Sequence, residues 1–178
     1  MTIYFRVSDR LAGLESLLRF DINPPANESV EISGELSLSM LVHLARNPQI
    51  KINLSQETWS KIGATREQLQ RFLDEGKKVY GLNTGFGPNV NKPTLPLRTI
   101  GTLQEKIIMS HASSIGKPMP VEVVRTIYLL VLQKWATGMS GVSPELVMRL
   151  LHAYNAGIYA LIPEFGSCGA SGDLSPLS

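Results

Sequence analysis

The chain has 178 residues, of which 43% are hydrophobic and 18% charged, which is typical of a globular protein and excludes a disordered tail. A formal net charge of +2, spread along the chain, argues against a nucleic-acid-binding surface. Cys168 is the only cysteine, which excludes an internal disulfide and favours a cytoplasmic location. Charged residues interrupt the N-terminus from Arg6 onward, and the aliphatic stretch at 127–132 is too short to span a bilayer. We therefore expect neither nucleic acid nor a membrane as a partner.

The first part of the chain is expected to combine short strands with amphipathic helices. Residues 1–29 carry little pattern and are predicted to form an N-terminal arm. Alternation of apolar residues predicts strands near 30–32 and 50–54, separated by a helix that Ser37 or Ser39 caps. A second helix is predicted to begin at the capping-box spacing of residues 65–68 and to end at Gly76.

A long loop and three helices are predicted to follow. Residues 79–96 are rich in Gly, Asn and Pro, and long loops within compact domains are often functional. Helical patterns cover residues 97–113, 121–137 and 144–156. The middle pattern is apolar on nearly every side, which predicts burial among more helices than this chain provides. We therefore expect an incomplete, mainly α protein with long loops and a few short strands, in which residues 30–178 form one domain.

The segment GSCGASGDLSP at residues 166–176 is rich in glycine and serine. By itself it predicts a flexible turn before a helix, with Asp173 as the N-cap and Pro176 near the helix start. A hydrolase nucleophile elbow would need glycine two residues after Ser171, where Asp173 stands. A phosphate loop would need Gly-Lys-Ser/Thr, which the segment lacks.

Residues 166–178, GSCGASGDLSPLS, closely resemble the prosthetic-group loop of the histidine and aromatic amino-acid ammonia-lyases and aminomutases. Residues 80–87, YGLNTGFG, resemble a second signature of that family. A third is matched by Leu103-Gln104, Ser110-His111 and Gly116-Lys117-Pro118, and weaker likenesses lie at residues 30–34 and 138–142. The segments occur in the family's order, so the resemblance runs from about residue 30 to residue 178.

The resemblance implies a largely helical lyase that makes its own electrophile, 4-methylidene-imidazol-5-one, from Ala170, Ser171 and Gly172. In the family, the glycine nitrogen attacks the alanine carbonyl, two waters are lost, and the serine supplies the methylidene. Glycine and alanine suit this closure because neither crowds the ring that forms. No metal is implied.

The same resemblance assigns roles to residues outside the loop. Tyr80 matches the position that removes the β-proton of the substrate, although a tyrosine without the motif would be structural. Asn83 and Gly87 of the same signature are expected to contact the substrate. Ser110 and His111 match the pair that faces the substrate side chain, a form typical of histidine lyases and some tyrosine lyases. The alternative for His111 is a histidine satisfied within its own helix.

Two features depart from the family pattern. Ser114 stands where the family usually has glycine, and Gln133-Lys134 stand where an asparagine is common. The sequence also ends directly after the loop, whereas family members continue through a helical domain and build shared active sites in a homotetramer. Three hypotheses stay open: a lyase acting on histidine or a related aromatic amino acid, an aminomutase, and an inactive fragment that binds partner chains.

Overall fold

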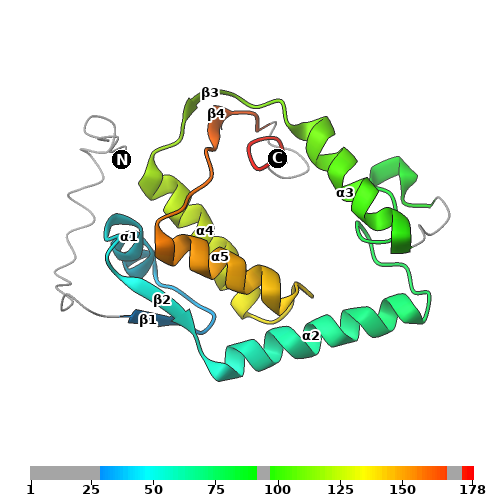
Figure 1. Ribbon diagram of the computed structural model, residues 1–178, viewed down its shortest axis with the longest axis horizontal. Helices are drawn as coiled ribbons and strands as arrows, with labels where there is room; N and C mark the ends of the chain where they lie inside the picture. Colours follow the sequence, from blue (N-terminus) through cyan, green and yellow to red (C-terminus); the bar gives the residue numbers. More distant parts are fainter. Residues whose placement is uncertain (1–28, 92–96, 168–173) are drawn as a thin grey trace. The chain divides into compact units, whose positions relative to one another are not determined.

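The computed structural model describes residues 29–91, 97–167 and 174–178, with the backbone alone between 97 and 103 (Figure 1). Residues 1–28 of the predicted N-terminal arm and the tripeptide at 170–172 lie outside these residues, and Ser29, predicted as the last residue of the arm, begins a strand. The described residues form two compact units, the first from 29–66 and 119–160, and the second from 67–91, 97–118, 161–167 and 174–178. The chain is mainly helical with a few short strands, as the sequence predicts.

Unit 1 begins with a strand, a helix and a second strand. Strands β1 (Ser29–Ile32) and β2 (Lys51–Leu54) pair in parallel, and helix α1 (Leu38–Arg46) connects them. The Ser37 hydroxyl accepts a hydrogen bond from the Met40 N–H at 3.2 Å and so caps α1. Both predicted strands and the predicted cap are therefore confirmed.

Two further helices complete unit 1. Helix α4 (Val121–Ala136) lies beside α5 (Pro144–Ala156), as Figure 1 shows. The Ser143 hydroxyl caps α5 by accepting from the Leu146 N–H at 3.3 Å, and Gly157 ends it in the left-handed conformation, with φ of 73°. The ends of α5 match the sequence prediction, and α4 stops one residue before the predicted end.

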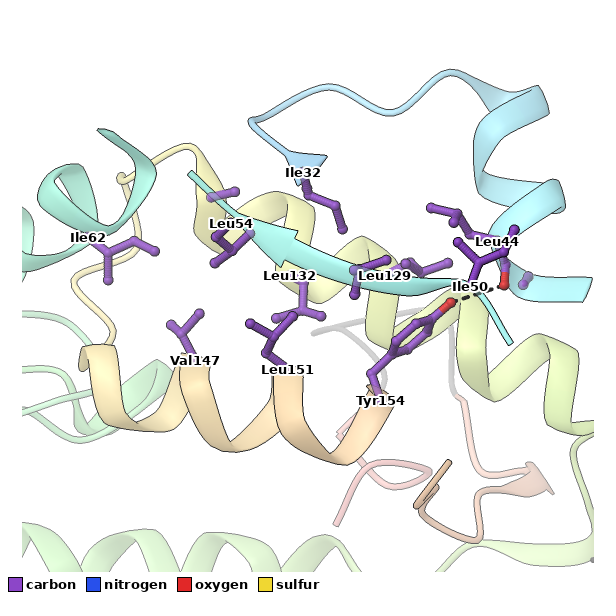
Figure 2. Packing of buried hydrophobic residues seen from close by; sticks show 13 residues of the cluster. Ile32, Leu44, Ile50, Leu54, Ile62, Leu129, Leu132, Val147, Leu151 and Tyr154 are labelled. Atoms are coloured by element: carbon purple, nitrogen blue, oxygen red, sulfur yellow. Dashed lines mark hydrogen bonds between the residues drawn. The ribbon is translucent and has the colours of Figure 1, made fainter. Parts of the chain in front are cut away.

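The hydrophobic core of unit 1 lies where α4 and α5 pack against β2. Figure 2 shows Val147, Leu151 and Tyr154 of α5 pointing toward side chains of β2 and α4. Leu129 and Leu132 of α4 are fully buried in this cluster. Each such side chain contributes about 1.5–3 kcal/mol through burial.

Helix α4 also exposes apolar side chains, as its pattern predicts. Val123 is 40% and Leu130 47% exposed, although Val124 and Leu129 beside them are buried. On α5, Leu146 is 48% exposed. Unit 1 therefore retains apolar surface that its own described helices leave uncovered.

Arg125 of α4 is buried in unit 1, with 2% of its surface exposed, and the sequence pattern did not single it out. Its guanidinium donates hydrogen bonds to the carbonyls of Leu44 at 2.6 Å, Ala45 at 2.8 Å and Asn47 at 3.3 Å. It also donates to the Tyr154 hydroxyl at 2.7 Å. These acceptors include the last carbonyls of α1, so Arg125 caps the C-terminus of that helix from a distant part of the chain.

Tyr154 completes this network from α5. Its hydroxyl accepts from Arg125 and donates to the Leu44 carbonyl at 3.0 Å. Burial raises the pKa of Tyr154 to about 12, against the opposing effect of the Arg125 charge. The phenol therefore stays neutral and keeps its proton for the Leu44 carbonyl at physiological pH.

We expect Arg125→Met to lower the free energy of unfolding by about 3 kcal/mol, because it leaves several buried acceptors without a donor. Arg149→Met is the matched control, since Arg149 is an exposed helical arginine in an i,i+4 pair with Glu145 and should cost less than about 0.5 kcal/mol. Urea unfolding followed by circular dichroism measures both changes. Equal losses for the two variants would contradict the capping role of Arg125.

Helix α2 (Gln56–Asp74) differs from its sequence prediction at its N-terminus. It begins well before Thr65, because the Ser55 hydroxyl accepts from the Thr58 N–H at 3.1 Å and caps an earlier turn. The Thr65 hydroxyl instead donates to the Lys61 carbonyl at 2.9 Å within the helix, so the predicted capping box at 65–68 is wrong. The predicted end is confirmed, since the helix stops at Asp74 and Gly76, two residues on, adopts φ of 71°.

The remaining elements belong to unit 2. They are the short 3-10 helix η1 (Gly87–Asn89), helix α3 (Leu97–His111) and the antiparallel strands β3 (Ile115–Pro118) and β4 (Pro163–Phe165). The sequence analysis missed both strands, since Gly116 and Pro118 favour turns over strands. Residues 174–177 form hydrogen-bonded turns where a helix start was predicted. Among the described residues, no helix is long and apolar enough to cross a membrane.

Candidate active site

The loop that follows α2 is held by its own polar side chains. The Asn83 side chain is buried, accepts from the Val79 N–H at 2.8 Å and donates to the Lys77 carbonyl at 2.9 Å. The buried Thr84 hydroxyl accepts from the Gly81 N–H at 3.1 Å and donates to the Gly85 carbonyl at 2.9 Å. Both side chains therefore satisfy loop backbone groups that no helix or sheet could satisfy.

Tyr80 projects from this loop, with 64% of its surface exposed. Its hydroxyl oxygen accepts a hydrogen bond from the Gly87 N–H at 3.3 Å. Its ring meets the ring of Phe86 edge to face, with centroids 5.8 Å apart. The phenol is therefore oriented by two contacts and remains open to solvent, as a group that exchanges protons with a small molecule must be.

Glycines give the loop its tight shape. Gly87 has φ of 52°, a left-handed conformation that favours glycine, and its N–H donates to the Tyr80 hydroxyl. A Cβ on Gly85 would lie 2.7 Å from the Cβ of Asn89 and 2.8 Å from its carbonyl oxygen. No side chain fits there, so glycine at position 85 is a steric requirement of the loop.

Ser110 and His111 lie at the C-terminal end of α3. His111 Nδ1 lies 2.7 Å from the Ile107 carbonyl oxygen, and the Ser110 hydroxyl donates to the same oxygen at 2.9 Å. The Ser110 oxygen is also 3.1 Å from His111 Nδ1. In the neutral tautomer with the proton on Nδ1, the bond to Ile107 leaves Nε2 as an acceptor. The bond to Ile107 agrees with the alternative of a histidine satisfied within its own helix, and contact with a substrate side chain stays a prediction.

Gln104, to which the sequence analysis gave no role, connects helix α3 to the loop that carries Tyr80. Gln104 of α3 donates from Nε2 to the Gly81 carbonyl at 3.5 Å, next to Tyr80. His111 lies further along the same helix, about 10 Å from Gln104 along the axis. The structure therefore places the helix that carries the Ser110-His111 pair against the loop that carries Tyr80.

The residues on either side of the tripeptide also belong to unit 2. Gly166 follows β4 on one side, and Ser175 lies in the turns at 174–177 on the other. Ala170, Ser171 and Gly172 themselves lie outside the described residues, so their predicted role is not tested by geometry. In the part of the chain that the structure describes, no cluster of His, Cys, Asp or Glu is arranged to hold a metal ion.

A family model described as aromatic amino acid lyase matches residues 36–178. The chain belongs to this family. The match contains all three signatures, and the predicted recognition is confirmed.

Individual relatives agree with the assignment. The chain is 39% identical over 145 residues to histidine ammonia-lyase of Vibrio cholerae, covering 82% of this chain and 28% of that protein. Among solved structures, it resembles the ergothioneine degrading enzyme ergothionase from Treponema denticola, with 33% identity and a TM-score of 0.77 over 84% of this chain and 30% of that one. Phenylalanine aminomutase from Pantoea agglomerans gives 29% identity and a TM-score of 0.75 over 84% of this chain and 28% of that one. The chain thus spans less than a third of the length of these relatives.

Proposed function

We propose that this chain is the N-terminal part of an ammonia-lyase that acts on histidine or a related aromatic L-amino acid. The products are ammonia and a trans α,β-unsaturated acid. The observation that carries the proposal is that one compact unit contains the Tyr80 loop, the Ser110-His111 helix end and both flanks of the tripeptide. The similarity to histidine ammonia-lyases supports histidine as the first substrate to test.

The flanks of the tripeptide fit the formation of a methylidene-imidazolone from Ala170, Ser171 and Gly172. A Cβ on Gly166 would overlap the Ser114 hydroxyl and lie 3.0 Å from the Ser175 hydroxyl, so the chain before and after the tripeptide meets at one place. A segment with its ends joined is suited to closing a ring within itself. When present, the ring supplies an electrophile that helps an amine to leave and acidifies the β-hydrogen of the substrate.

The chain's own residues supply the proton chemistry and orientation. In its deprotonated form Tyr80 accepts the β-proton on its phenolic oxygen, to which the Gly87 N–H donates a hydrogen bond. His111, anchored at Nδ1, presents Nε2 to the substrate side chain beside Ser110, and Gly87 contacts the substrate. The buried Asn83 side chain supports this contact by holding the loop backbone. The remaining contacts come from the rest of the protein, which we propose is a cytoplasmic homotetramer with active sites shared between subunits.

An aminomutase is the second candidate, favoured by the similarity to phenylalanine aminomutase. It uses the same electrophile and returns ammonia to the β-carbon, so its product is a β-amino acid. Product analysis separates the two reactions.

The test is to incubate the full-length protein that carries this chain with histidine, phenylalanine and tyrosine, and to follow ammonia, unsaturated acid and β-amino acid. We expect unsaturated acid from at least one of them. In a parallel sample, residues 1–178 expressed alone should associate, because α4 and α5 expose apolar side chains such as Leu130 and Leu146. They should form no product, because the remaining substrate contacts come from the rest of the protein.

Light scattering measures that association. A stable monomer of residues 1–178 that turned over any of the three amino acids would contradict this expectation. A full-length protein that formed neither product would support the inactive, partner-binding alternative.

A further inference from the structure

Three serine hydroxyls meet in unit 2 beside the loop that carries the tripeptide. The Ser114 and Ser175 hydroxyl oxygens are 2.8 Å apart, and Ser113 lies 3.2 Å from Ser175. Ser114 and Ser175 are both half-buried, whereas Ser113 is exposed. The shorter bond therefore joins the start of β3 to the turn that follows the tripeptide, at a place partly shielded from water.

The chain that precedes the tripeptide reaches the same place through the β3–β4 ladder. Ile115 of β3 pairs with Phe165 of β4, so the antiparallel register brings Gly166 opposite Ser114. A Cβ on Gly166 would overlap the Ser114 hydroxyl, and only glycine permits this approach. Gly166, Ser114 and Ser175 thus converge, although Gly166 and Ser175 lie on opposite sides of the tripeptide in sequence.

We propose that the Ser114–Ser175 hydroxyl pair, which we call the serine clamp, holds the two ends of the tripeptide segment together and speeds its cyclisation. This inference rests on the proposed function. Both serines are positioning residues that act through the backbone. Ser114 carries the hydroxyl that a glycine at this position would lack, so this clamp depends on a side chain that departs from the family pattern.

The ring closure that the serine clamp would assist needs no reactant from outside the chain. The Gly172 nitrogen forms a bond to the Ala170 carbonyl carbon, and the carbonyl oxygen leaves as water with the amide hydrogens of Gly172 and Ser171. The Ser171 side chain then loses its hydroxyl and the α-hydrogen as a second water, which leaves the methylidene. No oxidant is consumed. Attack requires the nitrogen to reach the carbonyl carbon, and joining the segment's ends reduces the conformations that compete with this approach.

The test compares how fast the full-length protein loses two waters after a pulse of synthesis, followed by intact mass. Ser114→Ala and Ser175→Ala should each slow ring formation by about 3- to 10-fold, as expected for the loss of one hydrogen bond that favours the reactive geometry. The double variant should be no slower than Ser175→Ala, because Ser175→Ala already removes the bonds of Ser175 to both Ser114 and Ser113. Ser175→Thr keeps a hydroxyl and should restore most of the rate.

Ser178→Ala is the matched control. The Ser178 hydroxyl lies in the same turn but donates locally to the Leu174 carbonyl, so its loss should leave the rate unchanged. A second measurement uses the Ser171→Ala background, in which the methylidene cannot form. There, Ser114→Ala should speed hydrogen exchange at the amides of Leu177 and Ser178, which donate to carbonyls of the same turn.

The outcomes separate the inference from the proposed function. Parental rates of water loss in both clamp variants, or unchanged exchange in the turn, would overturn the serine clamp and leave the proposed function standing. A parent protein that never loses two waters would overturn the proposed ring, and the role of the serine clamp with it. Slower cyclisation in both variants, with rescue by threonine, supports the inference.

Discussion

Replacement of Ser171 by alanine is expected to prevent the second loss of water and to reduce turnover by at least about 100-fold, as for a principal catalytic group. Alanine has no hydroxyl to eliminate, so the methylidene cannot form even if the Gly172 nitrogen closes the ring. The parent should be two waters lighter than its encoded mass, and the variant one water lighter at most. Intact mass and ammonia release, measured on the same preparations, give both results.

The Ser171→Ala result is informative only if the protein still folds. We expect little change in thermal unfolding, since the substitution removes a single oxygen atom. Ser178→Ala, a serine substitution in the turn after the tripeptide, serves as the control and should retain the two-water loss and the activity. An active parent of unmodified mass would refute the ring, whatever the variant does.

Replacement of Tyr80 by phenylalanine is expected to leave the ring in place and to lower turnover by about 100- to 10,000-fold, the range for loss of a general base. Within the described part of the chain, the hydroxyl accepts a hydrogen bond from the Gly87 N–H, and the phenylalanine ring can keep the edge contact with Phe86. Stability should therefore change by less than about 1 kcal/mol. Steady-state kinetics, intact mass and urea unfolding separate a chemical effect from a structural one.

Tyr128→Phe provides a closely matched control for Tyr80→Phe. The Tyr128 hydroxyl also accepts from a backbone N–H, that of Ala160 at 3.0 Å, but it belongs to unit 1. Removing it deletes the same group and the same kind of bond without touching the Tyr80 loop. If the two variants lost activity equally, Tyr80 would be a structural tyrosine and the assigned proton transfer would be wrong.

Helix and turn boundaries were the part of the fold that the sequence predicted best. Ser37 and Ser143 cap helices as expected, and Gly76 and Gly157 follow helix ends in the left-handed conformation. The exception is α2, where Thr65 has the spacing of a cap but Ser55 performs the capping. Thr65 has Gln68 three residues on and so matches a capping box, whereas Ser55 has Thr58 there, so the capping-box pattern favoured the wrong residue.

The candidate site was also predicted only in part. Resemblance to the family gave expected roles to Tyr80, Ser110, His111 and the tripeptide, and all of these roles remain predictions. It gave no role to Gln104, whose bond to the Gly81 carbonyl joins α3 to the Tyr80 loop. Asn83 was predicted to contact substrate, and the structure adds that its amide already holds the loop backbone.

Most helices, most turns and the family could be predicted from the residues alone, because caps, glycines and signature motifs act over a few neighbouring residues. Only the tertiary structure showed that Arg125 binds the end of α1, 80 residues away, and that Ser114 meets Ser175, 61 residues away. No spacing rule predicts such pairs, since a buried cation or a hydroxyl finds its partner only after strands and helices have packed. The pairing of β3 with β4 also depends on tertiary structure. The residues of both strands have weak strand preference, and they become extended because the two strands contact each other.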